Sequence, residues 1–164
     1  MTVGFLGGAQ IDRFANLNTT VVGPYDKPKT RLPGGGGAPE ISIACGEIFI
    51  IMRQAPRSFV SKLDFVTSFG HGSGGDERAR LGIKTKGPTR LVTDLAAFAP
   101  DPATKEMTVI SIHPGVAREQ IQANTGWPVR YAGDVIETPA PTDQELSVLR
   151  EVHARTARAH GEAA

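Results

Sequence analysis

The hydrophobic residues of this chain fall into short runs separated by glycine and proline, which is the pattern of an α/β protein. The clearest run is residues 47–52, which is nearly continuous in apolar side chains. A parallel strand that is covered on both faces has this composition. We therefore expect a central strand here, with Ile48, Phe49, Ile50 and Ile51 all largely inaccessible to solvent.

Further strands and short helices alternate along the chain. Residues 3–9 form an apolar run with glycines, as in a buried parallel strand. A segment that starts at residue 106 returns after an Asp-Pro turn and predicts an antiparallel hairpin. Other expected elements are strands at residues 19–22, 89–94, 96–98 and 106–112 and a helix at residues 116–124. This order predicts an α/β fold with a mostly parallel central sheet, flanking helices and an added antiparallel hairpin.

The last element is predicted to be a helix that packs on the rest of the domain. Thr142 and Glu145 match a capping box, which marks a helix start. Leu146, Leu149 and Val152 then repeat at helical spacing and form an apolar stripe.

Composition supports one globular domain. The chain has 164 residues, of which 40% are hydrophobic and 21% are charged, enough to bury a core. We expect this domain over residues 1–155 and a frayed tail over residues 156–164. A net charge of +1 gives no reason to expect nucleic acid or a membrane as a partner. The single cysteine, Cys45, rules out an intrachain disulfide and is expected in the core, so we predict a cytoplasmic protein.

Four consecutive glycines, Gly34, Gly35, Gly36 and Gly37, precede Ala38. The proline and glutamate that follow suit the first turn of a helix, which we expect to continue to residue 45. Backbone N–H groups of such a turn can bind phosphate, carboxylate or a developing oxyanion, because no Cβ blocks the approach. The alternative is a flexible loop, since neither the P-loop pattern nor Gly-x-Gly-x-x-Gly is present.

A second glycine-rich loop covers residues 70–76 and contains His71 and Asp76. One histidine and one aspartate are too few for a closed metal site. We expect a structural or lid loop, with contact to the nucleotide part of coenzyme A as an intermediate possibility. The four histidines of the chain show no metal-ligand spacing, so no metal is expected.

Several segments together resemble one protein family. They are residues 4–14, 16–20, 28–38, 59–68, 77–82, 91–94 and 124–126. In this ordered series the chain resembles the β subunit of family I CoA-transferases, and the glutaconate CoA-transferase branch looks nearest. The resemblance covers residues 3 to about 155 and implies the same α/β fold.

The resemblance implies transfer of coenzyme A between an acyl-CoA and a carboxylic acid through a glutamyl-CoA intermediate. The coenzyme A thioester is then a substrate, and no bound cofactor is expected. The backbone N–H groups of Gly36 and Gly37 are implied to stabilise the oxyanion. Gly35 fills the variable place of the motif and is expected to tolerate serine. Implied substrate or coenzyme A contacts are Gly34, Gly35, Ala38 and Gln10.

The resemblance also implies an α-type subunit as a partner, because family members place the active site between two subunits or two fused halves. In the family, the nucleophilic glutamate lies in a segment that precedes the part matched here. None of the nine glutamates of this chain lies in a Glu-Asn-Gly or Glu-Ser-Gly setting. We therefore expect a hetero-oligomer, and no activity from the chain alone.

Two alternatives stay open at this stage. One is a hydrolase on the same scaffold, since relatives that lack this glutamate open rings of coenzyme A thioesters in steroid breakdown. The other is a noncatalytic piece that only completes a fold or an assembly. The acyl group cannot be named from these residues.

Overall fold

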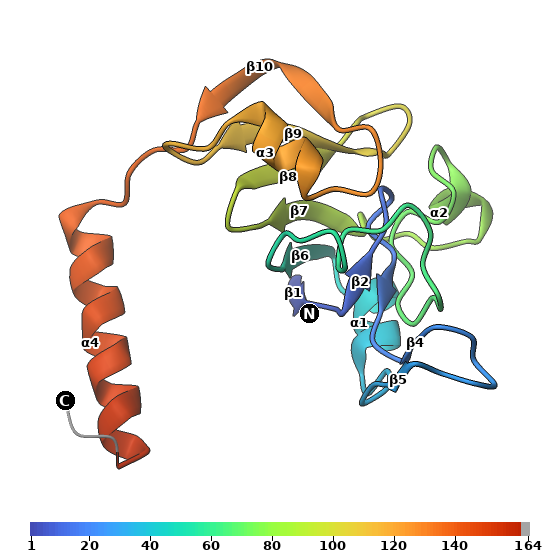
Figure 1. The fold of residues 1–164 in the computed structure, drawn as a ribbon, viewed down its shortest axis with the longest axis horizontal. Helices are drawn as coiled ribbons and strands as arrows, with labels where there is room; N and C mark the ends of the chain where they lie inside the picture. Colours follow the sequence, from blue (N-terminus) through green and yellow to red (C-terminus); the bar gives the residue numbers. More distant parts are fainter. Residues whose placement is uncertain (162–164) are drawn as a thin grey trace.

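A six-stranded sheet forms the centre of the fold in a computed structural model that describes residues 1–161 (Figure 1). The strand order is β1-β6-β7-β8-β9-β10. β1 pairs in parallel with β6, β6 with β7, and β9 with β10, whereas β8 is antiparallel to both neighbours. The strands are β1 (Val3–Leu6), β6 (Glu47–Ile51), β7 (Pro88–Val92), β8 (Ala96–Pro100), β9 (Met107–Ile112) and β10 (Arg130–Glu137). The predicted fold class, a mostly parallel sheet with an added hairpin, is confirmed.

Two small antiparallel pairs stand beside this sheet. β2 (Gln10–Ile11) pairs with β3 (Leu17–Asn18), and β4 (Val21–Val22) pairs with β5 (Thr30–Arg31). The prediction of one strand over residues 19–22 is therefore wrong at its first two residues. The Asn18 side-chain oxygen accepts hydrogen bonds from the backbone N–H groups of Thr20 and Val21, at 2.9 and 3.2 Å. This local turn interrupts the strand.

Four helices complete the described chain. They are α1 (Ala38–Ala44), α2 (Glu77–Arg80), α3 (Arg118–Ala123) and α4 (Asp143–Ala159). α1 begins directly after the four glycines, as predicted, and α3 lies within the expected range 116–124. No described helix is long and apolar enough to cross a membrane.

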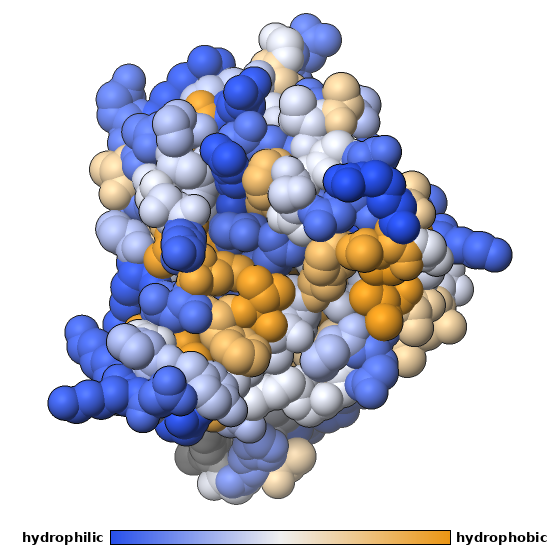
Figure 2. All heavy atoms as spheres, turned by 90° about the vertical axis from the view of Figure 1, so that its right-hand side faces the viewer, coloured by the Kyte–Doolittle hydropathy of each residue, from blue (hydrophilic) through white to orange (hydrophobic). Residues whose placement is uncertain are grey.

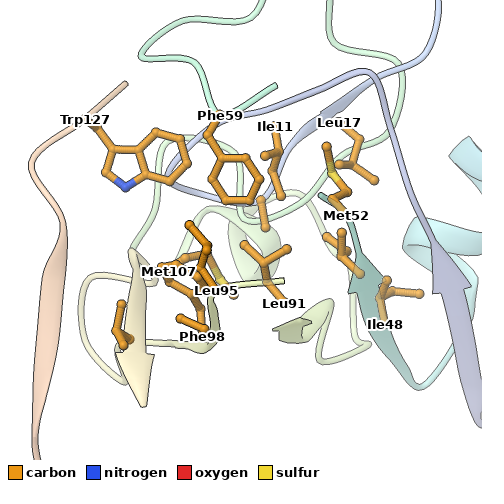
Figure 3. Close-up of a cluster of buried hydrophobic side chains, with 14 of the residues drawn as sticks. Ile11, Leu17, Ile48, Met52, Phe59, Leu91, Leu95, Phe98, Met107 and Trp127 are labelled. Atoms are coloured by element: carbon orange, nitrogen blue, oxygen red, sulfur yellow. The ribbon is translucent and has the colours of Figure 1, made fainter. Parts of the chain in front are cut away.

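The core lies between one face of the sheet and the segments that cover it (Figure 3). Ile48, Leu91 and Phe98 point into this core from the sheet, and all three are fully buried. Phe59 lies opposite them and stacks on Trp127, with ring centroids 5.7 Å apart. Trp127 anchors the packing here, because its side chain is 3% exposed.

The other face of the sheet is only partly covered in the described residues, which corrects the prediction for residues 47–52. Ile48 and Ile50 are buried, but Phe49 is half-buried and Ile51 is 60% exposed. Side chains alternate between the two faces of a strand. Phe49 and Ile51 therefore share the open face with Phe5, whose ring meets that of Phe49 edge-on.

α4 extends away from the rest of the molecule (Figure 1). Its predicted capping box between Thr142 and Glu145 is confirmed. The prediction that α4 packs on the domain is wrong within the described residues, since no residue of this helix is buried and Leu149 is 50% exposed. The helix continues to Ala159, beyond the predicted domain end at residue 155, and residues 162–164 of the predicted tail lie outside the described residues.

Candidate functional site

The glycine loop is fixed at its first residue by Thr19. The backbone N–H of Gly34 donates to the carbonyl of Thr19 at 2.9 Å, and the Thr19 hydroxyl donates to the carbonyl of Gly34 at 2.9 Å. Thr67 supports this arrangement, because its hydroxyl accepts from the Thr19 N–H at 2.9 Å. Two hydrogen bonds thus fix Gly34 on Thr19 and a third holds Thr19 itself, which argues against the alternative of a flexible loop.

The next backbone donors of the loop are free. The N–H of Ala38 donates to Gly35 at 2.9 Å, which closes the turn into α1. In contrast, the N–H groups of Gly35, Gly36 and Gly37 have no hydrogen-bond partner within residues 1–161. Gly36 and Gly37 are also exposed to solvent. The loop therefore holds three adjacent unpaired donors between two fixed ends, and these can bind an anionic oxygen.

The four positions differ in the structural reason that favours glycine, which is either the backbone φ or the space for a Cβ. Gly34 and Gly36 have φ of +99° and +51°, a region that L side chains rarely adopt, and a Cβ at either would meet nothing within 4 Å. Gly35 has ordinary φ, but a Cβ there would lie 3.2 Å from Pro39 and 3.3 Å from Thr67. Gly37 has φ of −89°, and a Cβ there would come no closer than 3.9 Å to any other residue. Gly37, rather than the supposedly variable Gly35, thus combines an ordinary φ with room for a side chain.

A cleft of about 340 Å³ opens beside the start of this loop. The N-terminal segment between β1 and β2 forms one wall, and the residues that lead into the loop form the other. The lining residues are Gly7, Gly8, Ala9, Thr19, Leu32, Pro33 and Gly34. The fold therefore brings the first glycine of the loop next to a segment about 25 residues earlier in the sequence.

Gln10 lies behind this wall and is 6% exposed. Its side-chain N–H donates to the Asp64 carboxylate at 2.8 Å, and its side-chain oxygen accepts from Asn18 at 2.7 Å. The N–H of Gly23 also donates to Asp64, and these hydrogen bonds lower the pKa of that carboxyl group, with the Gly23 bond as the larger cause. In this arrangement Gln10 supports the cleft wall, and direct ligand contact by Gln10 stays a prediction.

Arg78 is a supporting residue that the sequence did not single out. Its guanidinium is buried and donates to the carbonyls of Gly70, at 2.6 Å, and Ser42, at 3.2 Å, and to the Thr85 hydroxyl, at 2.8 Å. Burial lowers the pKa of Arg78 from its usual value. Because Ser42 belongs to α1, Arg78 connects this helix to the second glycine-rich loop. Arg78 lies within residues 77–82, one of the segments that resemble the family, but the resemblance implied no role for it.

The second glycine-rich loop is a packed structural element. His71 is 3% exposed, and its Nε2 lies 2.8 Å from the Pro88 carbonyl. Burial is the main cause that lowers the pKa of His71. The Asn16 side-chain oxygen accepts from the N–H groups of Gly70 and Gly72, at 2.8 and 3.1 Å. Within residues 1–161 no three His, Cys, Asp or Glu side chains are grouped so that they could hold a metal ion.

The parallel sheet, the glycine loop fixed at its entry to α1 and the ordered sequence motifs all agree with one family. A family model described as Coenzyme A transferase matches residues 1–124. The chain belongs to the coenzyme A transferase family, as the resemblance predicted.

Similar proteins support this assignment. The chain is 57% identical over 160 residues to the B-type subunit of 3-oxoadipate CoA-transferase from Pseudomonas knackmussii, and the match covers 98% of the chain and 62% of that relative. The crystal structure of glutaconate coenzyme A-transferase from Acidaminococcus fermentans matches with a TM-score of 0.83 and 36% identity, over 91% of this chain and 57% of that one.

A third relative is named for a different activity. The cholesterol ring-cleaving hydrolase IpdB subunit of Rhodococcus jostii is 30% identical over 147 residues, which cover 90% of the chain and 58% of the relative. In all three cases the chain spans about three fifths of the length of the protein that it matches.

Proposed function

We propose that this chain is the B-type subunit, or part of it, of an enzyme that transfers coenzyme A between an acyl-CoA and a carboxylic acid. The observation that carries the proposal is the row of three unpaired N–H groups at Gly35, Gly36 and Gly37, beside a cleft. A thioester carbonyl gains negative charge when a nucleophile attacks it, and fixed backbone donors stabilise that charge without reorganising. The substrate is a coenzyme A thioester, and the transfer needs no bound cofactor.

The chemistry proceeds by covalent catalysis. A glutamate carboxylate attacks the thioester carbon and expels coenzyme A thiolate, which gives an acyl-glutamyl anhydride. The thiolate then attacks the glutamyl carbonyl, which releases the donor carboxylate and leaves a glutamyl-CoA thioester. The acceptor carboxylate attacks this thioester, and the same two steps in reverse give the new acyl-CoA and free the glutamate. In this proposal the glutamate belongs to polypeptide outside the 164 residues, and Gly36 and Gly37 donate to each oxyanion. Gly34, Gly35 and Ala38 position the thioester.

We further propose an α-type subunit as the partner, in a cytoplasmic hetero-oligomer. Apolar side chains remain uncovered in several places, among them Phe5 at 65%, Leu81 at 59% and Leu149 at 50% exposure. On the side seen in Figure 2, apolar groups gather in the middle and hydrophilic groups lie at the edges. Exposed apolar patches rimmed by polar residues are typical of protein–protein contacts.

Reconstitution tests this proposal. The purified chain is assayed for exchange of coenzyme A between acetyl-CoA and a panel of dicarboxylic acids, first alone and then with an α-type subunit and a B-type segment that carries the glutamate. We expect no exchange by the chain alone and exchange by the complex. Rapid turnover by the isolated chain would refute the need for partners.

The same assay separates transfer from hydrolysis. A transferase forms the acyl-CoA of the acceptor acid, whereas a hydrolase consumes a thioester or ring bond without an acceptor. We favour transfer because the transferase relative is 57% identical and the hydrolase relative is 30% identical. Turnover of a cyclic acyl-CoA that ignores added acceptor acid would favour the hydrolase, and a well-folded complex without either activity would favour the noncatalytic alternative.

A further inference from the structure

A second cleft lies next to the glycine-loop cleft and has a different chemical character. Its volume is about 550 Å³. Gly8 and Ala9 line both clefts, so the two clefts are neighbours that share this part of their walls. The other lining residues of the second cleft are Val22, Lys29, Thr30, Arg57 and Ser58.

This second cleft is lined by hydrogen-bond donors that have no partner. Among residues 1–161, Lys29 and Arg57 are its only charged lining residues, and no carboxylate lines it. Neither of these two side chains makes an ion pair or a side-chain hydrogen bond within that range. The side-chain hydroxyls of Thr30 and Ser58 are likewise unpaired there. Two cations and two hydroxyls facing one cleft form a suitable site for an anionic oxygen group.

Backbone hydrogen bonds hold Lys29 itself and the neighbour of Arg57 in place. The N–H of Lys29 donates to the Val22 carbonyl at 2.9 Å, next to the pairing of β4 with β5. Beside Arg57, the Ser58 carbonyl accepts from the Ile11 N–H at 2.7 Å. The donors therefore come from two separate segments that the fold brings to the same cleft.

We propose that this second cleft binds an anionic group of the ligand whose reacting carbonyl lies at the glycine loop. This inference rests on the proposed function. Lys29 precedes Gly34 by five residues, which span at most roughly 18 Å even when fully extended. Since the two clefts also share Gly8 and Ala9, one ligand can reach both places. The group is a phosphate of coenzyme A or the far carboxylate of a dicarboxylic acid, since both present oxygen acceptors to cations.

The test measures binding rather than turnover. Isothermal titration calorimetry compares the parent chain with a Lys29→Gln/Arg57→Gln variant, using acetyl-CoA, acetyl-pantetheine, adipate and pentanoate as probes. Acetyl-pantetheine lacks the phosphates, and pentanoate lacks the second carboxylate. A Lys27→Gln/Arg150→Gln variant removes the same charge from exposed positions that do not line the cleft.

We expect the Lys29→Gln/Arg57→Gln variant to bind one anionic probe about tenfold more weakly, with the control variant unchanged. A loss for acetyl-CoA but not acetyl-pantetheine identifies a phosphate, and a loss for adipate but not pentanoate identifies the carboxylate. The parent should also lose more affinity than the variant between 0.05 and 1 M salt, in keeping with a Debye length that falls to about 3 Å at 1 M.

Several results would overturn the inference. The first two are equal affinities of parent and variant for both anionic probes, and an equal loss of affinity in the control variant. The others are a loss of affinity that extends equally to acetyl-pantetheine and pentanoate, and no binding of either anionic probe to the parent. None of these results decides whether the complete complex exchanges coenzyme A. The inference and the proposed function can therefore fail separately.

Discussion

The two glycine-rich loops of this chain look alike in sequence but differ in how their backbone is used. In the first loop, the N–H groups of Gly35, Gly36 and Gly37 are unpaired within residues 1–161. In the loop over residues 70–76, the N–H groups of all four glycines donate, to Asn16, His71 or Thr104. Glycine content alone therefore does not identify a ligand site; the partners of the N–H groups do.

The space around the glycines differs in the same way. A Cβ at Gly36 would meet nothing within 4 Å, whereas a Cβ at Gly70 would lie 2.6 Å from the Asn16 nitrogen and one at Gly74 2.5 Å from the Thr104 carbonyl oxygen. Positive φ occurs in both loops, at Gly34 and Gly36 in the first and at Gly72, Gly74 and Gly75 in the second. What differs is that Gly70 and Gly74 let backbone segments pack closely, whereas the glycines of the first loop leave their donors accessible.

The largest effect is expected on stability, from Gly70→Ala. The new Cβ would overlap the Ala15 carbonyl and the Asn16 backbone, neither of which can move like a side-chain end. We expect a loss of about 3 kcal/mol or more in the free energy of unfolding, as for severe overpacking. Urea unfolding followed by circular dichroism measures it. Gly37→Ala is the control and should leave the midpoint nearly unchanged; similar losses for both would remove the contrast between the loops.

The next effect concerns activity and comes from Gly36→Val in the reconstituted complex. The side chain would project into the space in front of the free donors, so kcat/KM should fall by about 10²- to 10³-fold, in line with loss of one oxyanion donor worth about 2.7–4 kcal/mol. Gly75→Val is the matched control, because Gly75 has a similar φ of +57° and equally open surroundings but a paired N–H. Equal activities of the two folded complexes would make the first loop purely structural.

A smaller loss of stability is expected from Arg78→Met, which keeps the apolar stem but removes the guanidinium. Its bonds to Gly70 and Ser42 join the second loop to α1. Because hydrogen bonds from charged groups contribute about 1.5–3 kcal/mol each and the freed carbonyls are only partly re-solvated, we expect a loss of about 2–3 kcal/mol. Thermal unfolding checks this. An unchanged midpoint would show that α1 does not depend on the second loop.

The smallest effect is a change in pH dependence at His71. Burial lowers the pKa of His71 below its usual value of 6.5 in the folded state. The unfolded state then binds more protons as pH falls through 6.5, so stability is complete above that pH and declines below it. His71→Gln should reduce this decline between pH 7.5 and 5, as measured by urea unfolding at each pH. A parallel pH profile for parent and variant would show that His71 has the same pKa in the folded and unfolded states.

Much of the fold could be predicted from the sequence, because strand runs and turn residues are local signals. Residues 47–52 formed a strand as expected, and the capping box at Thr142 marked the start of α4. What the sequence could not give was which apolar faces are covered. Ile51 and Leu149 stand in patterns typical of burial, but within residues 1–161 nothing packs over them, since burial depends on contacts with other segments.

The candidate site was predictable in part. The glycine loop was found because four glycines before a helix are an unusual local pattern. Its two supports, Thr19 and Arg78, act through hydrogen bonds to residues 15 and 36 positions away along the chain, which no local pattern reports. Likewise, the roles of Gly35 and Gly37 depend on nearby Pro39, Thr67 and Ile41 rather than on the motif itself.

The most direct test of the central claim is a nuclear magnetic resonance titration of the ¹⁵N-labelled chain with acetyl-CoA. If the free donors bind the thioester oxygen, the amide signals of Gly35, Gly36 and Gly37 should shift with ligand concentration, while those of Gly70 and Gly72, which already donate to Asn16, should not. Shifts confined to the second loop, or unmoved signals of the first loop at saturating acetyl-CoA, would contradict the claim that the Gly34–Ala38 loop forms the thioester site.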